Sequence, residues 1–199
     1  MPPSVSIVLR HISDTLRQVS ESSYDRAVSD AIGVLVDALT GGRKLLVFGN
    51  GGSSADAQHL CAELVGRFTR ERPALPAIAL TTNQALLTAW SNDYDFESVF
   101  VRQLEAFGQP GDVALGISTS GNSENVVRAL RRARELGLKT LGLTGAGGGR
   151  AADHCDVLMA VPLTDTPRIQ EVHLVTYHVI CAAIDEQMFG GVGTKDEDI

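Results

Sequence analysis

The sequence lacks several features that would each point to a particular class of protein. It has no apolar run close to the roughly 20 residues that span a bilayer, no CxxC pair and no basic excess, since its net charge at pH 7 is −7. Without CxxC pairs, neither a thiolate metal knuckle nor a redox pair is expected. Proteins that bind nucleic acids usually carry a basic patch, whereas the basic run RALRRAR at 128–134 has the amphipathic pattern of a solvated helix face. We therefore expect neither a membrane nor a nucleic acid as a partner.

Cysteine is scarce, and the three present are Cys61, Cys155 and Cys181. Their number is odd, their spacing is irregular and their neighbours are apolar, which is typical of reduced thiols in a reducing compartment. The first residues, MPPSVSIVLRHISDTL, lack the basic start and the unbroken apolar core of a signal peptide. These observations predict a cytoplasmic protein.

Residues 4–40 have the apolar periodicity of two helices, and Gly41-Gly42 ends the pattern as a C-terminal cap would. Such helices cannot bury their apolar stripes alone. We therefore predict an N-terminal helical arm at 1–42 that packs on the rest of the chain or on another subunit and takes part in assembly.

Beyond residue 42, short apolar runs alternate with helical patterns. The runs lack strict in–out alternation, which is typical of strands buried on both faces; they lie at 44–49, 76–81, 112–118, 139–144 and 156–161. Helical patterns follow at 54–69, 83–91, 96–107, 123–136 and 166–189. This order predicts an α/β domain at 43–190 with a three-layer, doubly wound, five-stranded parallel sheet. Residues 191–199 are expected to form a flexible tail.

Two loops each follow a predicted strand and lead into a helix. The loop STSGNS (118–123) offers four hydroxyls, those of Ser118, Thr119, Ser120 and Ser123. Together with the free N–H groups of the next helix, they could hold a phosphate monoester. Alternatively, Ser123 is an ordinary N-cap and the other hydroxyls belong to a turn. The loop GNGGSS (49–54) matches neither a Walker loop nor a dinucleotide fingerprint, and indicates a tight turn that approaches a ligand.

A set of metal-ligand types recurs on two predicted helices. His59 and Glu63 are four residues apart and share a helix face, while Gln170 and His178 lie eight apart, roughly on one face. Two imidazoles with oxygen ligands favour zinc or a late transition metal. Taken alone, a His–Glu pair at this spacing is more typical of a surface interaction. His173, about 140° around the helix from His178, is interpreted as a packing or surface residue.

Several idiosyncratic stretches carry a resemblance to a known family. They are GNGGSSADAQHLCAE (49–63), RERPALPAIALTTN (70–83), SNDYDFESVF (91–100), GQPGDVALGISTSGNSENV (108–126) and DTPRIQEVHLVTYHVI (165–180). From about residue 5 to 190 the chain resembles the phosphoheptose isomerases of the sugar isomerase (SIS) fold, a flavodoxin-like arrangement. The resemblance implies isomerisation of sedoheptulose 7-phosphate to D-glycero-D-manno-heptose 7-phosphate through an enediol.

The resemblance also implies the site and the assembly. One zinc ion per subunit would be held by His59, Glu63, Gln170 and His178, with Glu63 as the base and His178 as an acid/base for the oxygens. The substrate would be bound by Asn50, Gly51, Gly52, Ser53, Glu63, Asn92, Asp93, Ser118, Thr119, Ser120, Ser123 and Gln170. The family is tetrameric with sites at subunit interfaces, which implies a homotetramer.

Two alternatives remain open at this stage. Some SIS proteins only sense a sugar phosphate or bind a protein partner as a tetramer, and the presence of both Glu63 and His178 disfavours that reading. Another SIS isomerase that acts on hexulose phosphates is disfavoured by the metal-ligand set, which most of those enzymes lack.

Overall fold

The strands of the sheet lie in the order β2-β1-β3-β4-β5, and every neighbouring pair is parallel. The computed structural model describes residues 4–190. Its strands are β1 (Leu45–Gly49), β2 (Ala77–Ala79), β3 (Val113–Ser118), β4 (Lys139–Thr144) and β5 (Val157–Ala160). Strand β2 is added on one side of β1, and β3, β4 and β5 are then added on the other side. The direction in which strands are added therefore reverses between β1 and β3. In such sheets ligands bind at the carboxyl ends of the strands beside that switch point, where the loops at 49–54 and 118–123 lie.

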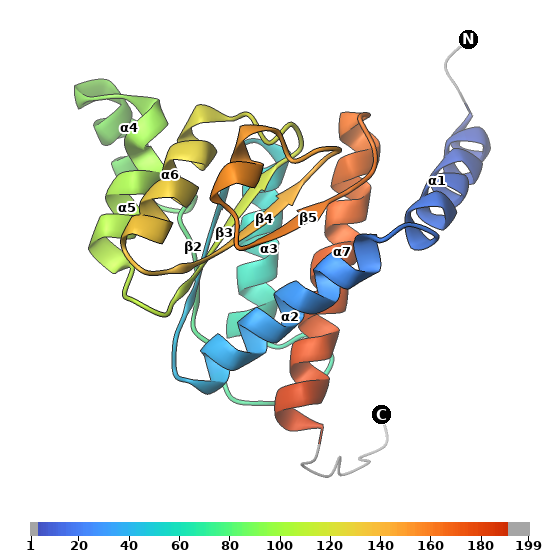
Figure 1. Cartoon of the computed structure of the whole chain (residues 1–199), viewed down its shortest axis with the longest axis horizontal. Helices are drawn as coiled ribbons and strands as arrows, with labels where there is room; N and C mark the ends of the chain where they lie inside the picture. Colours follow the sequence, from blue (N-terminus) through green and yellow to red (C-terminus); the bar gives the residue numbers. More distant parts are fainter. Residues whose placement is uncertain (1–3, 191–199) are drawn as a thin grey trace.

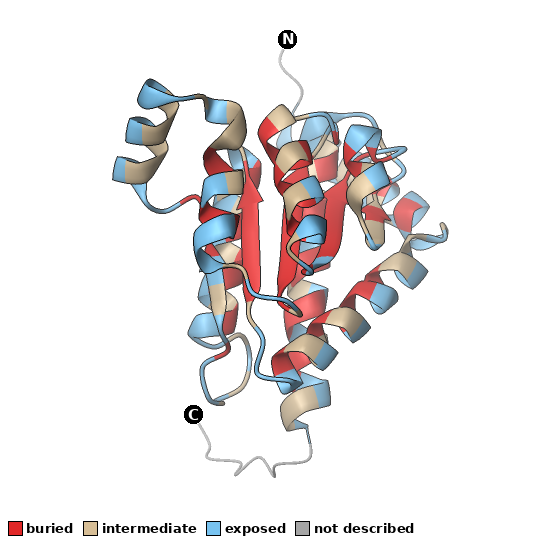
Figure 2. Ribbon diagram, turned by 60° about the vertical axis from the view of Figure 1, so that its left-hand side comes forward, coloured by how far each residue is buried: buried red, intermediate tan, exposed pale blue. Residues whose placement is uncertain are grey.

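Helices cover both faces of this sheet (Figure 1). On one face lie α2 (Tyr24–Thr40), α3 (Gly52–Val65) and α7 (Thr166–Phe189); on the other lie α5 (Val99–Phe107) and α6 (Glu124–Glu135). Figure 2 shows the buried strands between these layers. Alternate residues of β1 point to opposite faces of the sheet and so belong to two different hydrophobic cores. Leu45 and Val47 pack with α2, α3 and α7. Leu46 and Phe48 pack with α5 and α6. The predicted α/β fold is thus confirmed, and its strands lack alternation because both faces are covered.

The two helices of the predicted arm at 1–42 differ in how they pack on the rest of the chain. Helix α2 belongs to the main core, where its Ala31 and Leu35 are fully buried. Helix α1 (Val5–Ser20) stands away from the body (Figure 1), and its Val5 side chain is 74% exposed. Helix α2 thus packs on the rest of the chain, which is one of the two partners predicted for the arm, whereas α1 contributes only its last turns, with Val19 buried against α7. The predicted tail at 191–199 lies outside the described residues.

Three further helices complete the described part of the chain. Helix α4 (Gln84–Asp93) buries none of its residues and packs on α5 and on the 3-10 helix η1 (Phe96–Ser98). The second 3-10 helix, η2 (Gly149–His154), follows the glycine run after β4. Within residues 4–190, no helix combines the length and the apolar character needed to cross a membrane.

Candidate active site and metal centre

Helices α3 and α7 pack against each other (Figure 1) and bring together three potential metal ligands. The ligand atoms of His59, Glu63 and His178 all lie within 4.8 Å of one another. Nε2 of His59 is 2.9 Å from Oε1 of Glu63, and the rings of His59 and His178 meet edge to face with centroids 5.2 Å apart. A tetrahedral zinc ion with bonds near 2.1 Å holds its ligand atoms about 3.4 Å apart. Both the chemistry and the spacing of the cluster therefore fit a zinc ion after a small adjustment.

The cluster is open to one side. The His59 side chain is 42% exposed and that of Glu63 is 22% exposed. On the other side it rests on the core, where the ring of Phe68 lies 5.4 Å from that of His178. The hydroxyl of Tyr177 lies 2.9 Å from Nδ1 of His59, and burial raises the pKa of this tyrosine to about 12. A ligand can therefore reach the three residues from the exposed side, while contacts with Phe68 and Tyr177 hold the opposite side of the cluster in place.

A second carboxylate on α3, Asp56, lies near this cluster, and the sequence analysis missed it. Burial raises the pKa of Asp56 to about 6, although the nearby His59 opposes the shift. Its Oδ2 atom is buried without a hydrogen-bond partner among residues 4–190. Together with Gln170 and Leu174 of α7 it lines a cavity of about 480 Å³. The spacing of 56, 59 and 63 puts all three acidic and imidazole groups on one helix face, so the periodicity alone could have identified Asp56.

Gln170, the fourth predicted ligand, approaches from the side of the glycine loop. Its amide packs directly over Gly52, where a Cβ atom would overlap the Gln170 side chain. Gly52 precedes His59 by seven residues, or about 10 Å along the axis of α3. Gln170 therefore lies beside the glycine loop, about two helical turns from His59. His173, by contrast, is fully buried, and burial lowers its pKa to about 4, so it is a packing residue as interpreted from the sequence.

The hydroxyl loop at 118–123 lies at the carboxyl end of β3, as expected. Ser118 is buried, and its Oγ lies 3.1 Å from Oγ of Ser123, while Thr119 and Ser120 reach the surface. Ser123 is the N-cap of α6, but its hydroxyl makes no hydrogen bond to the free N–H groups of the helix. The backbone N–H of Val126 donates to Oδ1 of Asn125 at 3.0 Å, so the N–H groups of Glu124 and Asn125 are the ones that an anion could use. The loop is closed by Gly121, whose φ of +63° favours glycine and whose missing Cβ makes room for the backbone of Gly148.

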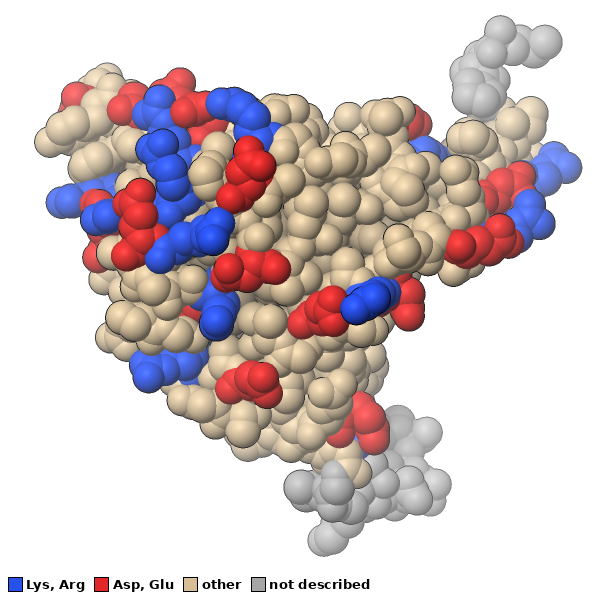
Figure 3. Space-filling model, in the orientation of Figure 1, with Lys and Arg blue, Asp and Glu red and all other residues tan. Residues whose placement is uncertain are grey.

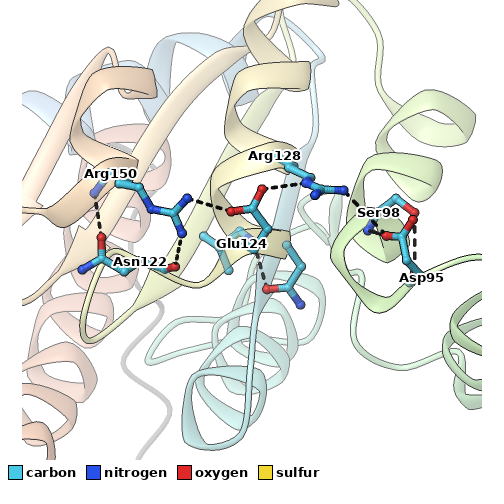
Figure 4. Close-up of polar contacts among 8 residues, drawn as sticks. Asp95, Ser98, Asn122, Glu124, Arg128 and Arg150 are labelled. Atoms are coloured by element: carbon cyan, nitrogen blue, oxygen red, sulfur yellow. Dashed lines mark hydrogen bonds and ion pairs between the residues drawn. The ribbon is translucent and has the colours of Figure 1, made fainter.

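Arg150 of helix η2 forms hydrogen bonds with this loop and with the first turn of α6 (Figure 4). The Arg150 guanidinium donates to the carbonyl oxygen of Asn122 at 2.7 Å and to Glu124 at 2.7 Å, and its backbone N–H donates to Oδ1 of Asn122. Glu124 also accepts from Arg128, and its two arginine partners lower its pKa. These contacts hold the loop and the first turn of α6 in one arrangement.

The glycine loop and the hydroxyl loop are joined by a pair of amides. Asn50 donates to Asn125 and Asn125 donates to Asn50, both at 2.9 Å. Asn50, predicted to line the sugar, therefore also fixes one loop against the other. Asn125 is buried in the first turn of α6 and was missed in the sequence, where a buried asparagine next to a loop has no distinctive pattern. Gly51 and Gly52 are exposed beside them, and Ser53 is buried in the first turn of α3.

Two predicted substrate contacts are not brought to the cluster within this chain. Asn92 and Asp93 are exposed at the end of α4, where Nδ2 of Asn92 donates to Oδ1 of Asp93. Helix α4 lies at the outer edge of the molecule, on the opposite side from α7 (Figure 1). Their contact with the sugar stays a prediction.

The basic run at 128–134 lies on a surface that carries charges of both signs. Charged side chains of both signs gather over α4, α5 and α6 on the left of Figure 3. Two of the four arginines of the basic run form ion pairs there, Arg128 with Glu124 and Arg132 with Glu105. Acidic and basic side chains are thus mixed on this surface, which is typical of a solvated helix face.

Known proteins match this chain over most of its length. A family model for the SIS domain matches residues 9–145. The phosphoheptose isomerase of Crocosphaera subtropica is 52% identical over 187 residues, which are 94% of this chain and 95% of that protein. Among solved structures, the phosphoheptose isomerase of Neisseria gonorrhoeae has 41% identity and a TM-score of 0.84, covering 91% of this chain and 98% of that one. The corresponding protein of Francisella tularensis has 36% identity and a TM-score of 0.87, covering 92% and 96%.

Proposed function

Because the chain belongs to the phosphoheptose isomerases, a family of SIS-domain proteins, we infer that it is an aldose–ketose isomerase acting on sedoheptulose 7-phosphate. The product is D-glycero-D-manno-heptose 7-phosphate. The observation that carries this conclusion is the meeting of His59, Glu63 and His178 between α3 and α7. A sensor of sugar phosphates would need the hydroxyl loop but no such cluster.

The hydroxyl loop is proposed to hold the phosphate group. Ser118, Thr119, Ser120 and Ser123 offer hydroxyl donors, and the N-terminus of α6 adds N–H groups that favour an anion. Asn50, Gly51, Gly52 and Ser53 would line the sugar, with Gln170 opposite Gly52. Because α3 leads from the glycine loop to His59 over about 10 Å, a substrate held at its phosphate end can extend along the helix to the cluster. Binding energy from the phosphate then serves to orient the distant reacting carbons.

Glu63 is proposed as the base of the isomerisation. It would take the proton from C1 of the open-chain ketose and return it to C2, with a cis-enediol between the two steps. Oε1 of Glu63 contacts His59, which leaves Oε2 as the candidate base. His178 would move the accompanying proton between the two substrate oxygens. A positioned base of this kind contributes about 10²- to 10⁴-fold to the rate.

The same cluster is proposed as the site of one zinc ion per subunit. His59, Glu63 and His178 would hold it, and Gln170 remains the predicted fourth ligand. When bound, zinc polarises a carbonyl group as a Lewis acid. Since Glu63 and His178 are assigned both to the metal and to proton transfer, they must act in turn, and the two oxygens of the Glu63 carboxylate allow this.

The active protein is proposed to be a cytoplasmic homotetramer with sites at subunit interfaces. Asn92 and Asp93 lie away from the cluster of their own chain, which supports a contribution from a neighbouring copy. The exposed apolar side chains of Leu174, Val175 and Val179 on α7 support a contact between copies beside the site. Three free cysteines, two of them buried, support a reducing compartment.

The test of this function is proton NMR of sedoheptulose 7-phosphate in ²H₂O with the enzyme. We expect exchange of the C1 proton and the appearance of aldoheptose signals. Glu63→Gln should lower kcat by about 10²- to 10⁴-fold while the circular dichroism spectrum and the oligomeric state stay unchanged. Turnover by Glu63→Gln close to that of the wild type would contradict the base assignment. Phosphate binding by the wild-type chain without any exchange would favour the non-catalytic sensor.

A further inference from the structure

Both ring nitrogens of His59 are engaged in this structure. Nε2 lies 2.9 Å from Oε1 of Glu63, and Nδ1 lies 2.9 Å from the hydroxyl oxygen of Tyr177. The two partners come from different helices, Glu63 from α3 and Tyr177 from α7. The orientation of the His59 ring is therefore fixed from both sides, and only one of these contacts involves another member of the proposed ligand set.

The chemistry of the partners sets the tautomer of the ring. An ionised carboxylate can only accept a hydrogen bond, so Nε2 carries the proton toward Glu63 and Nδ1 accepts from the Tyr177 O–H. When Nε2 binds a metal, it must give up its proton, and the proton of the neutral ring then resides on Nδ1. Because a phenolic hydroxyl can both donate and accept, Tyr177 can hold Nδ1 in either state.

We propose that Tyr177 is a positioning residue of the metal centre, whose hydroxyl holds Nδ1 of His59 and thereby directs Nε2 to the metal. This inference rests on the proposed ligand set of His59, Glu63 and His178. It assigns no direct contact between Tyr177 and the metal or the substrate.

The packing of Tyr177 makes it suited to this role. Its side chain is only 1% exposed and belongs to the core formed by α2, α3 and α7. Its ring meets the His59 ring at 72° with centroids 5.3 Å apart and the His178 ring at 87° with centroids 5.0 Å apart. One rigid side chain therefore contacts both imidazoles of the cluster, and its position is set by the core rather than by the open side of the site.

Tyr177→Phe tests the role of the hydroxyl, and the chain offers a matched control. Tyr24 of α2 is also a largely buried tyrosine that contacts α7, where its hydroxyl lies 2.8 Å from Oγ1 of Thr176. Tyr24→Phe therefore removes an equivalent hydroxyl that touches no member of the cluster. The affinity of each protein for zinc would be measured by competition with a chromophoric chelator, and the Co²⁺-substituted proteins would be compared by their visible spectra.

Loss of a hydrogen bond to a metal-bound histidine typically weakens metal binding by about 10- to 100-fold. We expect a loss of that size in Tyr177→Phe together with a changed Co²⁺ spectrum, and neither effect in Tyr24→Phe. At saturating zinc, kcat of Tyr177→Phe should return to within a few-fold of the wild type, because the residue acts through His59. Zinc affinity in Tyr177→Phe within twofold of the wild type would overturn the inference while leaving the ligand set intact.

A measurement on the unmodified protein keeps the inference testable if Tyr177→Phe does not fold. In the zinc-bound wild type, ¹⁵N NMR of the His59 ring should show the proton on Nδ1. A proton on Nε2, with the metal on Nδ1, would overturn the role of Tyr177. A wild-type chain that binds no zinc would overturn both this inference and the ligand set, which separates that result from a failure of the tyrosine alone.

Discussion

At the scale of the residue, Asp56 makes the stability of the protein depend on pH. Its pKa rises from an ordinary value of 3.8 to about 6 because the carboxyl group is partly buried. Between pH 4 and 6 the unfolded carboxyl group is therefore ionised while the folded one keeps its proton. Folding takes up a proton in this window, so the free energy of unfolding contributed by Asp56 falls as the pH rises through it.

Asp56→Asn removes this titration. In protein freed of metal with a chelator, we expect the variant to gain stability over the wild type at pH 7.5, on the order of 1 kcal/mol after allowance for solvent screening, and to gain none at pH 4. Urea unfolding at both pH values measures this difference. Asp37→Asn, which changes an exposed carboxylate on α2, is the control. An equal effect of Asp56→Asn at both pH values would contradict the assigned cause.

The individual residues also show how far sequence reasoning reaches. His59 and Glu63 were found because their spacing puts them on one face of one helix. Their residue types suggested a joint metal site with Gln170 and His178, and the family resemblance then implied the full ligand set. Tyr177 and Asn125 were missed because their partners, His59 and Asn50, are distant in sequence. Contacts of this kind depend on how two elements pack, and no local periodicity encodes that.

At the scale of the element, a buried ion pair fixes the end of α3 to α7. Arg72 and Asp185 are 1% and 2% exposed, and Nε of Arg72 is 2.9 Å from Oδ1 of Asp185. The Arg72 guanidinium also donates to the backbone oxygens of Glu63 at 2.7 Å and Leu64 at 2.8 Å. It thereby satisfies carbonyl groups that a helix end leaves free and ties the helix that carries Glu63 to the one that carries His178.

Arg72→Met should lower the free energy of unfolding by about 3–5 kcal/mol, because it leaves the Asp185 charge buried and unpaired. Arg67→Met is the matched control in the same stretch of chain. Arg67 pairs with Glu71, but the two side chains are 60% and 86% exposed, so its loss should cost no more than about 1 kcal/mol. Urea denaturation of both variants measures the difference. Similar losses in the two variants would show that the Arg72 pair does not stabilise the junction of α3 and α7.

The hydroxyl loop depends on a close approach of two glycine-rich turns. A Cβ on Gly121 would meet the backbone of Gly148, in addition to the strain of its positive φ. Gly121→Ala should therefore displace the loop and raise KM for the sugar phosphate. Gly147→Ala is the control, because Gly147 has a φ of +75° but open space around its missing Cβ. Steady-state kinetics should show a clearly larger rise in KM for Gly121→Ala, and equal values in both variants would exclude the contact as its cause.

The elements themselves were largely readable from the sequence. The five predicted strands agree with the observed ones to within one residue except for β2, which is confined to Ala77–Ala79 at the edge of the sheet. Helix η2 was not predicted, because its sequence GRAADH follows a glycine run and has no helical periodicity. Its position is set by contacts with the hydroxyl loop, in which Arg150 binds Asn122 and Glu124.

At the scale of the whole molecule, the sequence could not decide which N-terminal helix belongs to the body. Both helices have an apolar stripe, so both were expected to bury that stripe against another part of the protein. Helix α2 packs into the core of its own chain, where Leu35 is fully buried, whereas Ile7 of α1 remains 56% exposed. Periodicity predicts that a stripe is buried, but only the packing shows against what.

The exposed apolar side chains of α7 give the last prediction, on assembly. Val179 is 48% exposed and adjoins His178. If α7 packs against another copy, Val179→Asp would bury an unpaired charge and should convert the proposed tetramer to smaller species, as measured by light scattering after size exclusion. Activity should fall with it, because the proposed site takes Asn92 and Asp93 from a neighbouring copy. Phe107→Asp, a 45% exposed position on α5 across the sheet, is the control. A fully active wild-type monomer would contradict the shared site.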